Sequence, residues 1–261
     1  MVVFAVHAFT ISVTDAARQH VFVNACINRI TADHLSQLDR KNELQRIEEI
    51  LSTVVPDTND TFLFERTLHT RGFSCVAGLD EAGRGPLAGP VVAACVVLPP
   101  HCDSALFLDS KKLSHKRRCL LAGILTEIGA PTGVGIVSHT TIDRINILQA
   151  SLLAMKRAVE NLSATTPTPD FLLIDGKFKI PMDTPQQPLI HGESKSASIA
   201  AASILAKVTR DALMDELDRQ FPAYNFTQNK GYPTKGHRDA IKQYGPVVCH
   251  RMTFKGVKEF V

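Results

Sequence analysis

The chain has 261 residues, 44% of them hydrophobic, and a formal net charge of +3 at neutral pH. That length allows one large domain, or one and a half, with ample material for a core, and the composition is that of an ordinary globular protein. Because no run of 18 apolar residues occurs, the sequence excludes a membrane-spanning helix.

Six cysteines occur without a C-x-x-C pair and without metal-ligand spacing. Disulfides are rare in reducing compartments, so the simplest interpretation is a reduced protein of the cytoplasm. The segment 1–13 is fairly apolar, but it lacks the positive charge and the long apolar core of a secretory signal. We therefore expect a cytoplasmic protein.

Residues 1–60 form what we interpret as an N-terminal extension. Residues 1–34 fit a strand around 21–27, an unpacked extension, or upstream sequence included by a wrong start, and the sequence does not decide among them. Residues 35–54 are predicted to form an amphipathic helix that Pro56 stops. Its apolar face consists of Leu35, Leu38, Leu44, Ile47, Leu51 and Val54.

From residue 61 onwards, apolar strand-like runs alternate with amphipathic helical patterns, which is typical of an α/β sheet. A helix over 62–69 precedes two strands, one through Asp80 and one over 91–98, that we expect to form a hairpin. The other expected elements are a helix over 116–128 capped by Ser114, a strand over 133–137, one long helix from Ile142 to Leu162 opened by a capping box of Thr140 and Asp143, a strand over 171–174, a helix over 194–221 and a helix over 237–244.

The stretch from Gly78 to Pro90 carries the chemistry that the rest of the chain is arranged around. Asp80 and Glu81 stand where a strand approaches a Gly- and Pro-rich turn. Successive side chains of a strand point to opposite faces, so both carboxylates serve one site only if the strand ends or bulges there. A plain solvated turn is the alternative interpretation.

Gly83, Arg84 and Gly85 place a cation between two residues that have no side chain. Such a segment lets backbone N–H groups approach a ligand closely, and arginine binds phosphate well. The spacing fits neither the dinucleotide fingerprint nor a P-loop. A second acid, Asp175, ends the apolar strand 171–174, and it would lie beside Asp80 if the two strands were parallel neighbours.

Several ordered motifs resemble those of one family. They are GLDEAGRGPLAGPV from Gly78, DSKKLS from Asp109, LIDG from Leu173, SKSASIAAASILAKVTRD from Ser194 and KGYPTKGH from Lys230. Together they resemble bacterial ribonuclease HII, a type 2 ribonuclease H, over about residues 61–261. The resemblance implies a ribonuclease H-like mixed β-sheet flanked by helices over 61–221, followed by a small, basic, helical C-terminal appendage over 222–261.

The resemblance also implies an endonuclease that cuts the RNA strand of RNA/DNA hybrids and cuts at single ribonucleotides in duplex DNA, leaving 3′-hydroxyl and 5′-phosphate ends. Two ions of Mg²⁺ or Mn²⁺ would be held by Asp80, Glu81, Asp175 and Glu193, because carboxylates suit these hard ions. Glu193 departs from the family, in which this acid is commonly Asp, so ion preference or rate is in doubt.

The resemblance assigns substrate contacts as well. Gly83, Arg84 and Gly85 correspond to the backbone reader of the 2′-hydroxyl that separates RNA from DNA, and Tyr232 to a tyrosine that packs on the neighbouring sugar. A half-buried loop tyrosine is the alternative interpretation of Tyr232. Lys111 and Lys112 would hold phosphates, although a solvated basic run is the more usual case.

Asp211 competes with Glu193 for the place of the fourth acid. A continuous helix from about 195 to 211 separates its ends by roughly 24 Å, too far for both to serve two ions about 4 Å apart. Glu193 lies at the positive N-terminal end of that helix, whereas a surface ion pair with Lys207 explains Asp211. We therefore predict that Glu193 is the fourth ligand.

Two other functions stay open at this point, a nuclease or strand-transfer enzyme on the same fold that acts on DNA alone, and a module that binds hybrids without cutting them. The Gly-Arg-Gly segment argues against the first and the four acids against the second. Residues 220–261 hold seven Lys and Arg against two Asp and Glu. This balance suits a polyanionic partner, although a solvated surface would also explain it. We expect a monomer.

Overall fold

The computed structural model describes residues 45–47, 49–51, 60–100, 102–107, 113–164 and 166–261. The chain divides into two compact units, residues 1–50 and 51–261. Residues 45–47 and 49–51 are helical, within the helix expected over 35–54. The remainder of that helix, residues 1–34, Lys111 and Lys112 lie outside the described residues.

The second unit is built on a five-stranded mixed sheet with the strand order β3-β2-β1-β4-β5 in its described part. The strands are β1 (Val76–Ala82), β2 (Val91–Val96), β3 (Thr132–Val137), β4 (Phe171–Asp175) and β5 (Gln186–Leu189). β1 and β2 pair antiparallel, which confirms the expected hairpin. β1 and β4 pair in parallel, with Leu79 opposite Ile174, so the arrangement assumed for Asp80 and Asp175 is confirmed.

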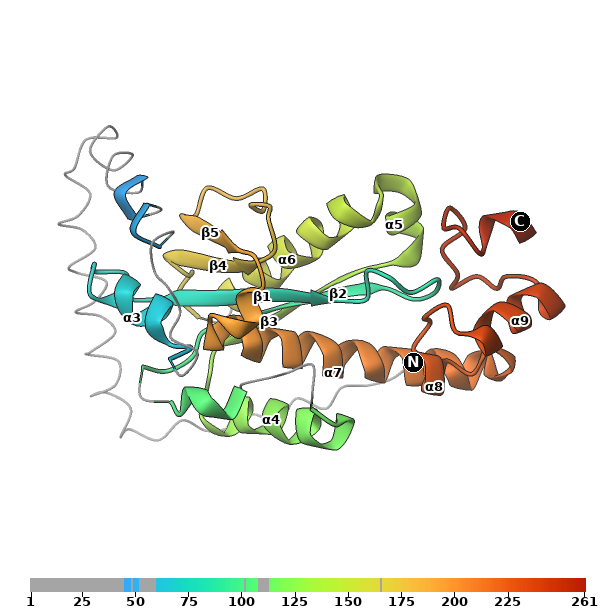
Figure 1. The fold of residues 1–261 in the computed structure, drawn as a ribbon, viewed down its shortest axis with the longest axis horizontal. Coiled ribbons are helices and arrows are strands. Elements are labelled where there is room, and N and C mark those ends of the chain that lie inside the picture. Colours follow the sequence, from blue (N-terminus) through green and yellow to red (C-terminus); the bar gives the residue numbers. More distant parts are fainter. Residues whose placement is uncertain (1–44, 48, 52–59, 101, 108–112, 165) are drawn as a thin grey trace. The chain divides into compact units, whose positions relative to one another are not determined.

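Helices cover both faces of this sheet (Figure 1). α6 (Ile147–Ser163) packs on one face, while α7 (Ala197–Gln220) and α4 (His115–Glu127) lie on the other. Alternate residues of β1 enter the two cores: Ala77 and Leu79 join the cluster under α6, and Gly78 meets α7. The fold is therefore a three-layer ribonuclease H-like sheet, as the sequence predicts.

The start of α7 approaches the backbone of β1 more closely than any side chain would permit. A β-carbon added to Gly78 would stand 2.1 Å from the carbonyl carbon of Ser198 and 2.3 Å from the nitrogen of Ile199. Alanines of α7 make the same close approach along the sheet, as expected. This contact places the beginning of α7 against Gly78, which precedes Asp80 by two residues in β1.

The smaller helices agree with the sequence except at one break. α3 (Leu63–His69) follows Phe62, and Ser114 caps α4 by accepting from Arg117 N. The single helix expected up to Leu162 is wrong, because α5 (His139–Ile145) ends at Asn146, whose φ of 67° starts α6 anew.

The expected capping box at this position is also wrong. Ser138 caps α5 by accepting from Thr141 N. Asp143 instead accepts from Met252 N at 2.8 Å and from Thr253 N at 3.0 Å. Its carboxylate ties the C-terminal segment to α5, a long-range contact that local spacing does not reveal.

After α7, whose N-cap is Ser196, the chain forms short elements: η5 (Pro222–Tyr224), α8 (Phe226–Asn229), α9 (Lys235–Tyr244) and η6 (Lys258–Phe260). They surround an apolar cluster that includes Tyr224, Phe226, Ile241 and Val257. Leu87 and Ala88 of the Gly-rich turn belong to the same cluster. The turn beside the acids is thus built into the C-terminal part of the chain.

His237, which sequence spacing separates from every other histidine, is buried against His250, with 3.1 Å between their Nε2 atoms. Burial lowers the pKa of both rings, that of His250 to about 4. The pair therefore behaves as a neutral part of this core. The described residues contain no helix long and apolar enough to cross a membrane.

Candidate active site

Asp80 and Glu81 lie inside a regular strand. β1 continues through both residues to Ala82, paired with Ala94 and Ala93 of β2, so the expected strand end or bulge is wrong. The opening lies on the other side, since pairing with β4 stops at Leu79. Beyond that point the edge of β1 facing β4 is open, and the acids of neighbouring strands meet there.

Asp80 is almost buried, with 7% of its surface exposed. Burial raises the pKa of its carboxyl well above the usual range, and the charges of Glu81, Asp175 and Glu193 add to this rise. The structure therefore brings the other three predicted carboxylates within electrostatic reach of Asp80. Asp80 Oδ1 accepts a hydrogen bond of 2.7 Å from Glu81 N, which fixes the side chain against the strand.

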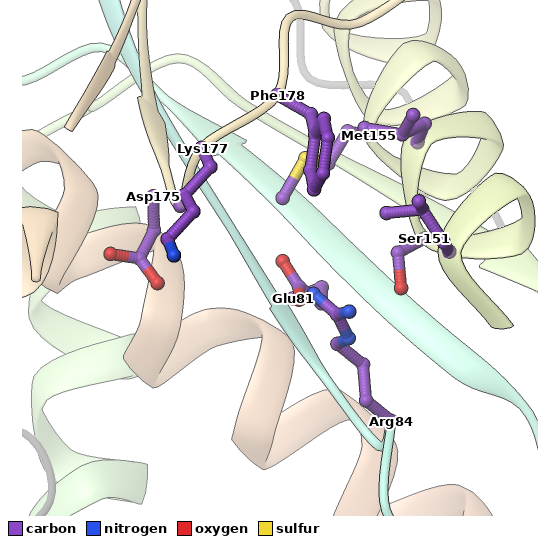
Figure 2. A pocket seen from close by; sticks show the side chains of 10 residues that line it. Glu81, Arg84, Ser151, Met155, Asp175, Lys177 and Phe178 are labelled. Carbon is purple, nitrogen blue, oxygen red and sulfur yellow. Dashed lines mark hydrogen bonds and ion pairs between the residues drawn. The ribbon is translucent and has the colours of Figure 1, made fainter. Parts of the chain in front are cut away.

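Glu81 projects to the α6 side of the sheet, where it pairs with Arg84 (Figure 2). Arg84 Nη1 stands 3.1 Å from Glu81 Oε1, and the Arg84 side chain is half exposed. Burial raises the pKa of Glu81, while the Arg84 guanidinium partly offsets that rise. Arg84 thus stands directly beside the acids, with one face open to a ligand.

Asp175 and Glu193 are brought together by β5. Asp175 pairs with Leu189 at the end of the β4–β5 ladder. The chain then turns back through Gly192, whose N–H donates to Asp175 Oδ1 at 2.7 Å. Glu193 follows in a short 3₁₀ turn just before α7 and is half-buried. This position agrees with the predicted location at the N-terminal end of the helix.

Four carboxylates at one sheet edge are a donor set that fits hard divalent cations. Burial is the main cause of the raised pKa of Asp80, and the neighbouring carboxylates add repulsion that such a cation would relieve. In the part of the chain that the structure describes, no three His, Cys, Asp or Glu side chains already stand where they would hold a metal ion. The carboxylates are instead held by local partners, Arg84 for Glu81 and Gly192 for Asp175.

Two buried arginines that the sequence analysis missed hold the Gly-rich turn from behind. Arg210 of α7 is fully buried and donates to three carbonyl oxygens. Its partners are the oxygens of Pro90 at 3.0 Å, Lys230 at 2.9 Å and Ala88 at 3.1 Å. The sequence signal that could have indicated this role was a charged residue, Arg210, within a helix rich in small residues.

Arg251 is equally buried and holds the same turn at both ends. It donates to the carbonyl oxygens of Gly83 at 2.6 Å, Arg84 at 2.9 Å, Gly89 at 3.1 Å and Pro90 at 3.3 Å. Burial lowers the pKa of Arg251 to about 9, and the charge of Arg210 adds to the effect. At neutral pH both guanidinium groups stay charged beneath the turn.

Gly83 is required by this packing, whereas Gly85 is not. Gly83 has a φ of +101°, and a β-carbon there would stand 2.1 Å from Arg210 Nε. At Gly85 the same construction meets Tyr232 Cε1 at 3.5 Å, so the Tyr232 ring lies against the turn. Tyr232 is 41% exposed. The structure thus exposes Arg84, Gly85 and Tyr232 next to one another, while Gly83 is buried beneath them against Arg210.

Asp211 pairs with Lys207 at 2.7 Å, as expected, but the pair is not on the surface, because the Asp211 side chain is only 4% exposed. His115 Nδ1 stands 3.7 Å from its other oxygen. The acids whose charges raise the pKa of Asp80 do not include Asp211. Lys111 and Lys112 lie outside the described residues, so their predicted phosphate contacts stay predictions.

The fold and the acid edge together define a nuclease of the ribonuclease H-like class. Comparison with known proteins specifies the class further. The family model described as Ribonuclease HII matches residues 77–257. The ribonuclease HII of Desulfotalea psychrophila is 58% identical over 215 residues, which cover 82% of this chain and 96% of the relative. That of Geobacter metallireducens is 52% identical, covering 76% of this chain and 92% of the relative.

Solved structures agree with this result. The ribonuclease H2 of Pyrococcus horikoshii superposes with a TM-score of 0.58 at 26% identity, covering 72% of this chain and 97% of that one. The ribonuclease HII of Archaeoglobus fulgidus, solved with PCNA, gives a TM-score of 0.57 at 27% identity, covering 70% of this chain and 96% of that one. The chain belongs to the ribonuclease HII family. It is a ribonuclease H, a metal-dependent enzyme that cleaves the RNA strand of an RNA/DNA hybrid.

Proposed function

We propose that this ribonuclease H also cuts duplex DNA at single embedded ribonucleotides, leaving 3′-hydroxyl and 5′-phosphate ends. The observation that carries the proposal is the position of Tyr232, whose ring lies against Gly85, the residue after the Arg84 that pairs with Glu81. One ribonucleotide offers a single 2′-hydroxyl, so its recognition needs a compact reader next to the cleaving groups. The braced turn and Tyr232 supply such a surface.

Asp80, Glu81, Asp175 and Glu193 are the proposed ligands of two Mg²⁺ or Mn²⁺ ions. Such ions activate a water molecule and stabilise the leaving oxygen at phosphorus. The protein supplies a sheet edge on which Asp80 is held rigidly by burial and by Glu81 N. Glu193 carries its charge one methylene further than an aspartate would, which affects the choice between the two ions rather than the reaction.

Gly83, Arg84 and Gly85 are the proposed readers of the 2′-hydroxyl. Because Arg210 and Arg251 hold carbonyl groups of the turn from the buried side, its exposed side is left to Arg84 and to the backbone of Gly85. Arg84 would then serve the phosphate or the sugar while keeping its partner Glu81 in place. Lys111 and Lys112 are proposed to contact phosphates further along the strand.

Cleavage of three matched duplexes tests the proposal: one with a single ribonucleotide, one with a full RNA strand and one of DNA alone, each with Mg²⁺ and with Mn²⁺. We expect cuts in the first two and none in the third. Asp80→Asn should abolish cleavage but keep duplex binding, since it removes charge and little volume. If the all-DNA duplex were cut as fast as the other two, the enzyme would be a nuclease that does not recognise ribonucleotides, and the proposal would be wrong. An active Asp80→Asn variant would contradict the assignment of the site.

We further propose the division into a 1–60 extension, a 61–221 catalytic core and a 222–261 basic segment, acting as a monomer in the cytoplasm. The family match, which begins at residue 77, supports an extension outside the core, and the bridge of Ala88 to His250 supports a last segment that packs on the Gly-rich turn. Light scattering during turnover would test the monomer, and a stable dimer at working concentration would contradict it.

A further inference from the structure

An open hollow lies on the α6 side of the acids, and the proposed function leaves most of it unused. It is lined by residues of β1, of α6, of the end of β4 and of the loop that follows β4. Figure 2 shows Glu81, Arg84 and Asp175 along one side, with Ser151 and Met155 of α6 opposite and Lys177 and Phe178 at the rim. The hollow is therefore continuous with the catalytic edge.

Ser151 shows that this hollow is suited to a ligand. Ser151 is only 2% exposed, yet its Oγ has no hydrogen-bond partner among the described residues. Figure 2 shows Ser151 on the α6 side of the hollow, across from the Arg84 guanidinium. A buried hydroxyl without a partner costs free energy, which an oxygen of a bound ligand would recover.

Lys177 and Phe178 indicate what kind of ligand fits. They follow Asp175 by two and three residues, after Gly176, and both are exposed. Phe178 keeps 51% of its surface exposed, so its ring is accessible to a ligand beside this polar site. An ammonium group, an exposed ring and a hydroxyl within one hollow match the phosphate, the sugar face and the oxygens of one nucleotide.

We propose that this hollow is a subsite for one nucleotide of the substrate duplex next to the cleaved bond. The Phe178 ring packs on the sugar, Lys177 pairs with the phosphate, and Ser151 hydrogen-bonds to a sugar or phosphate oxygen. The sugar and phosphate are chosen because the bases of a duplex are already stacked and paired. Lys177 also offsets the repulsion between that phosphate and the carboxylates of Glu81 and Asp175. The inference rests on the proposed function, since it extends the same site.

The salt dependence of binding tests the role of Lys177 without any catalytic step. Binding of a fluorescent duplex to the metal-free protein is measured over a series of salt concentrations. Each phosphate contact adds about 0.9 to the slope of log K against log salt, so Lys177→Ala should reduce the slope by about one. Lys179→Ala, an exposed lysine on the same segment that does not line the hollow, is the control and should leave the slope unchanged. Equal slopes for Lys177→Ala and the parent would overturn the phosphate contact.

A duplex in which single phosphates are made neutral by methylphosphonate locates the contact. We expect one position where the neutral linkage weakens binding of the parent but not of Lys177→Ala. If every position weakens both proteins equally, Lys177 acts only through the general field, and the subsite is contradicted.

Phe178 and Ser151 are tested by steady-state kinetics on the single-ribonucleotide duplex. Phe178→Ala should raise KM about tenfold with little change in kcat, and Phe178→Tyr should restore it, because contacts of aromatic rings with nucleotides have about this strength. Ser151→Ala should raise KM without lowering the melting temperature, since it removes an unpartnered hydroxyl. If the parent cuts the duplex and both variants keep its KM, the subsite is rejected while the proposed function stands. A parent that fails to cut would reject the proposed function, while the binding slopes still decide the subsite.

Discussion

At the scale of single residues, the two candidates for the fourth acid have different surroundings. Glu193 is half-buried in the turn before α7, and its charge acts on Asp80. Asp211 is buried beside Lys207 and His115. Glu193 is therefore close enough to Asp80 for its charge to act there, as a shared metal site requires. Asp211 is instead one partner of a structural ion pair.

We predict that Glu193→Gln lowers kcat strongly and weakens the dependence on metal concentration, with little loss of stability. Asp211→Asn should leave kcat nearly unchanged and cost about 1–2 kcal/mol of folding free energy, because Lys207 loses its charged partner. Metal titrations of activity and urea unfolding of both variants check this. Large activity loss in a stable Asp211→Asn protein, beside a nearly normal Glu193→Gln protein, would reverse the assignment.

At the scale of elements, the Gly-rich turn is held by residues from the far end of the chain. Seven carbonyl contacts from Arg210 and Arg251 fix the turn and its neighbours, and nothing in the local sequence of the turn predicts them. The acceptors in these seven contacts are all backbone carbonyl oxygens, not carboxylates. Their role is therefore to position the turn.

Arg251→Lys keeps the charge but cannot span the carbonyls of Gly83 and Gly89 with a planar fork. We expect kcat/KM to fall more on a single-ribonucleotide duplex than on a long hybrid, because only the former depends on one well-placed reader. The measurement is the ratio of the two kcat/KM values in a protein shown to be folded by circular dichroism. Arg219→Lys, on the exposed end of α7, serves as the control. Equal losses on both substrates would mean that Arg251 only stabilises the fold.

The anchor of α7 gives a second prediction at this scale. Glu65 of α3 is buried, and its Oε1 accepts from Ser196 Oγ at 2.6 Å and Ser198 N at 3.0 Å. Burial raises the pKa of Glu65, and these hydrogen bonds only partly offset the rise. Since the folded-state pKa lies above the unfolded one, the associated stability is present at low pH and is lost as pH rises through the folded pKa.

Glu65→Gln should therefore show a smaller fall in unfolding free energy than the parent as pH rises above the ordinary glutamate range. Denaturant unfolding of metal-free protein across a pH series measures this, and the remaining slope reflects Asp80 and Glu81, whose pKa values are also raised. Glu160→Gln, exposed on α6, is the control. Parallel curves for the parent and Glu65→Gln would show that Glu65 does not carry the effect.

At the scale of the whole molecule, the four proposed metal ligands lie in the second compact unit. Asp80, Glu81, Asp175 and Glu193 all belong to residues 51–261, as do the arginines that hold the turn. The ribonuclease HII of Desulfotalea psychrophila is matched over 96% of its own length by 215 residues of this chain. The family match itself starts at residue 77.

We therefore expect removal of residues 1–34 to leave kcat/KM on a hybrid unchanged. These residues carry none of the motifs, and they precede the predicted amphipathic helix. Activity of the full and shortened chains at equal active-site concentration, with melting curves of both, makes the comparison. A shortened protein that is folded but inactive would show that the extension contributes to substrate binding or to the site.

The sequence by itself determined the local features of this protein: the strands β1 to β4 but not β5, most helices, the cap at Ser114, and the positions of the acids Asp80, Glu81, Asp175 and Glu193. Apolar periodicity and capping chemistry act over a few residues, so a linear reading captures them. The same reading joined α5 and α6 into one helix, because the left-handed conformation of Asn146 and the long-range partners of Asp143 leave no periodic sign.

Only the tertiary structure decided how these features combine into a site. It showed that Asp80 and Glu81 share an open edge because β4 ends beside β1, not because β1 ends. It brought Arg210 and Arg251 under a turn more than a hundred residues away, and placed Ser151, Lys177 and Phe178 around one hollow. Side-chain type and spacing are properties of the chain, but the desolvation and the charge that one group feels from another depend on distances that only the folded packing sets.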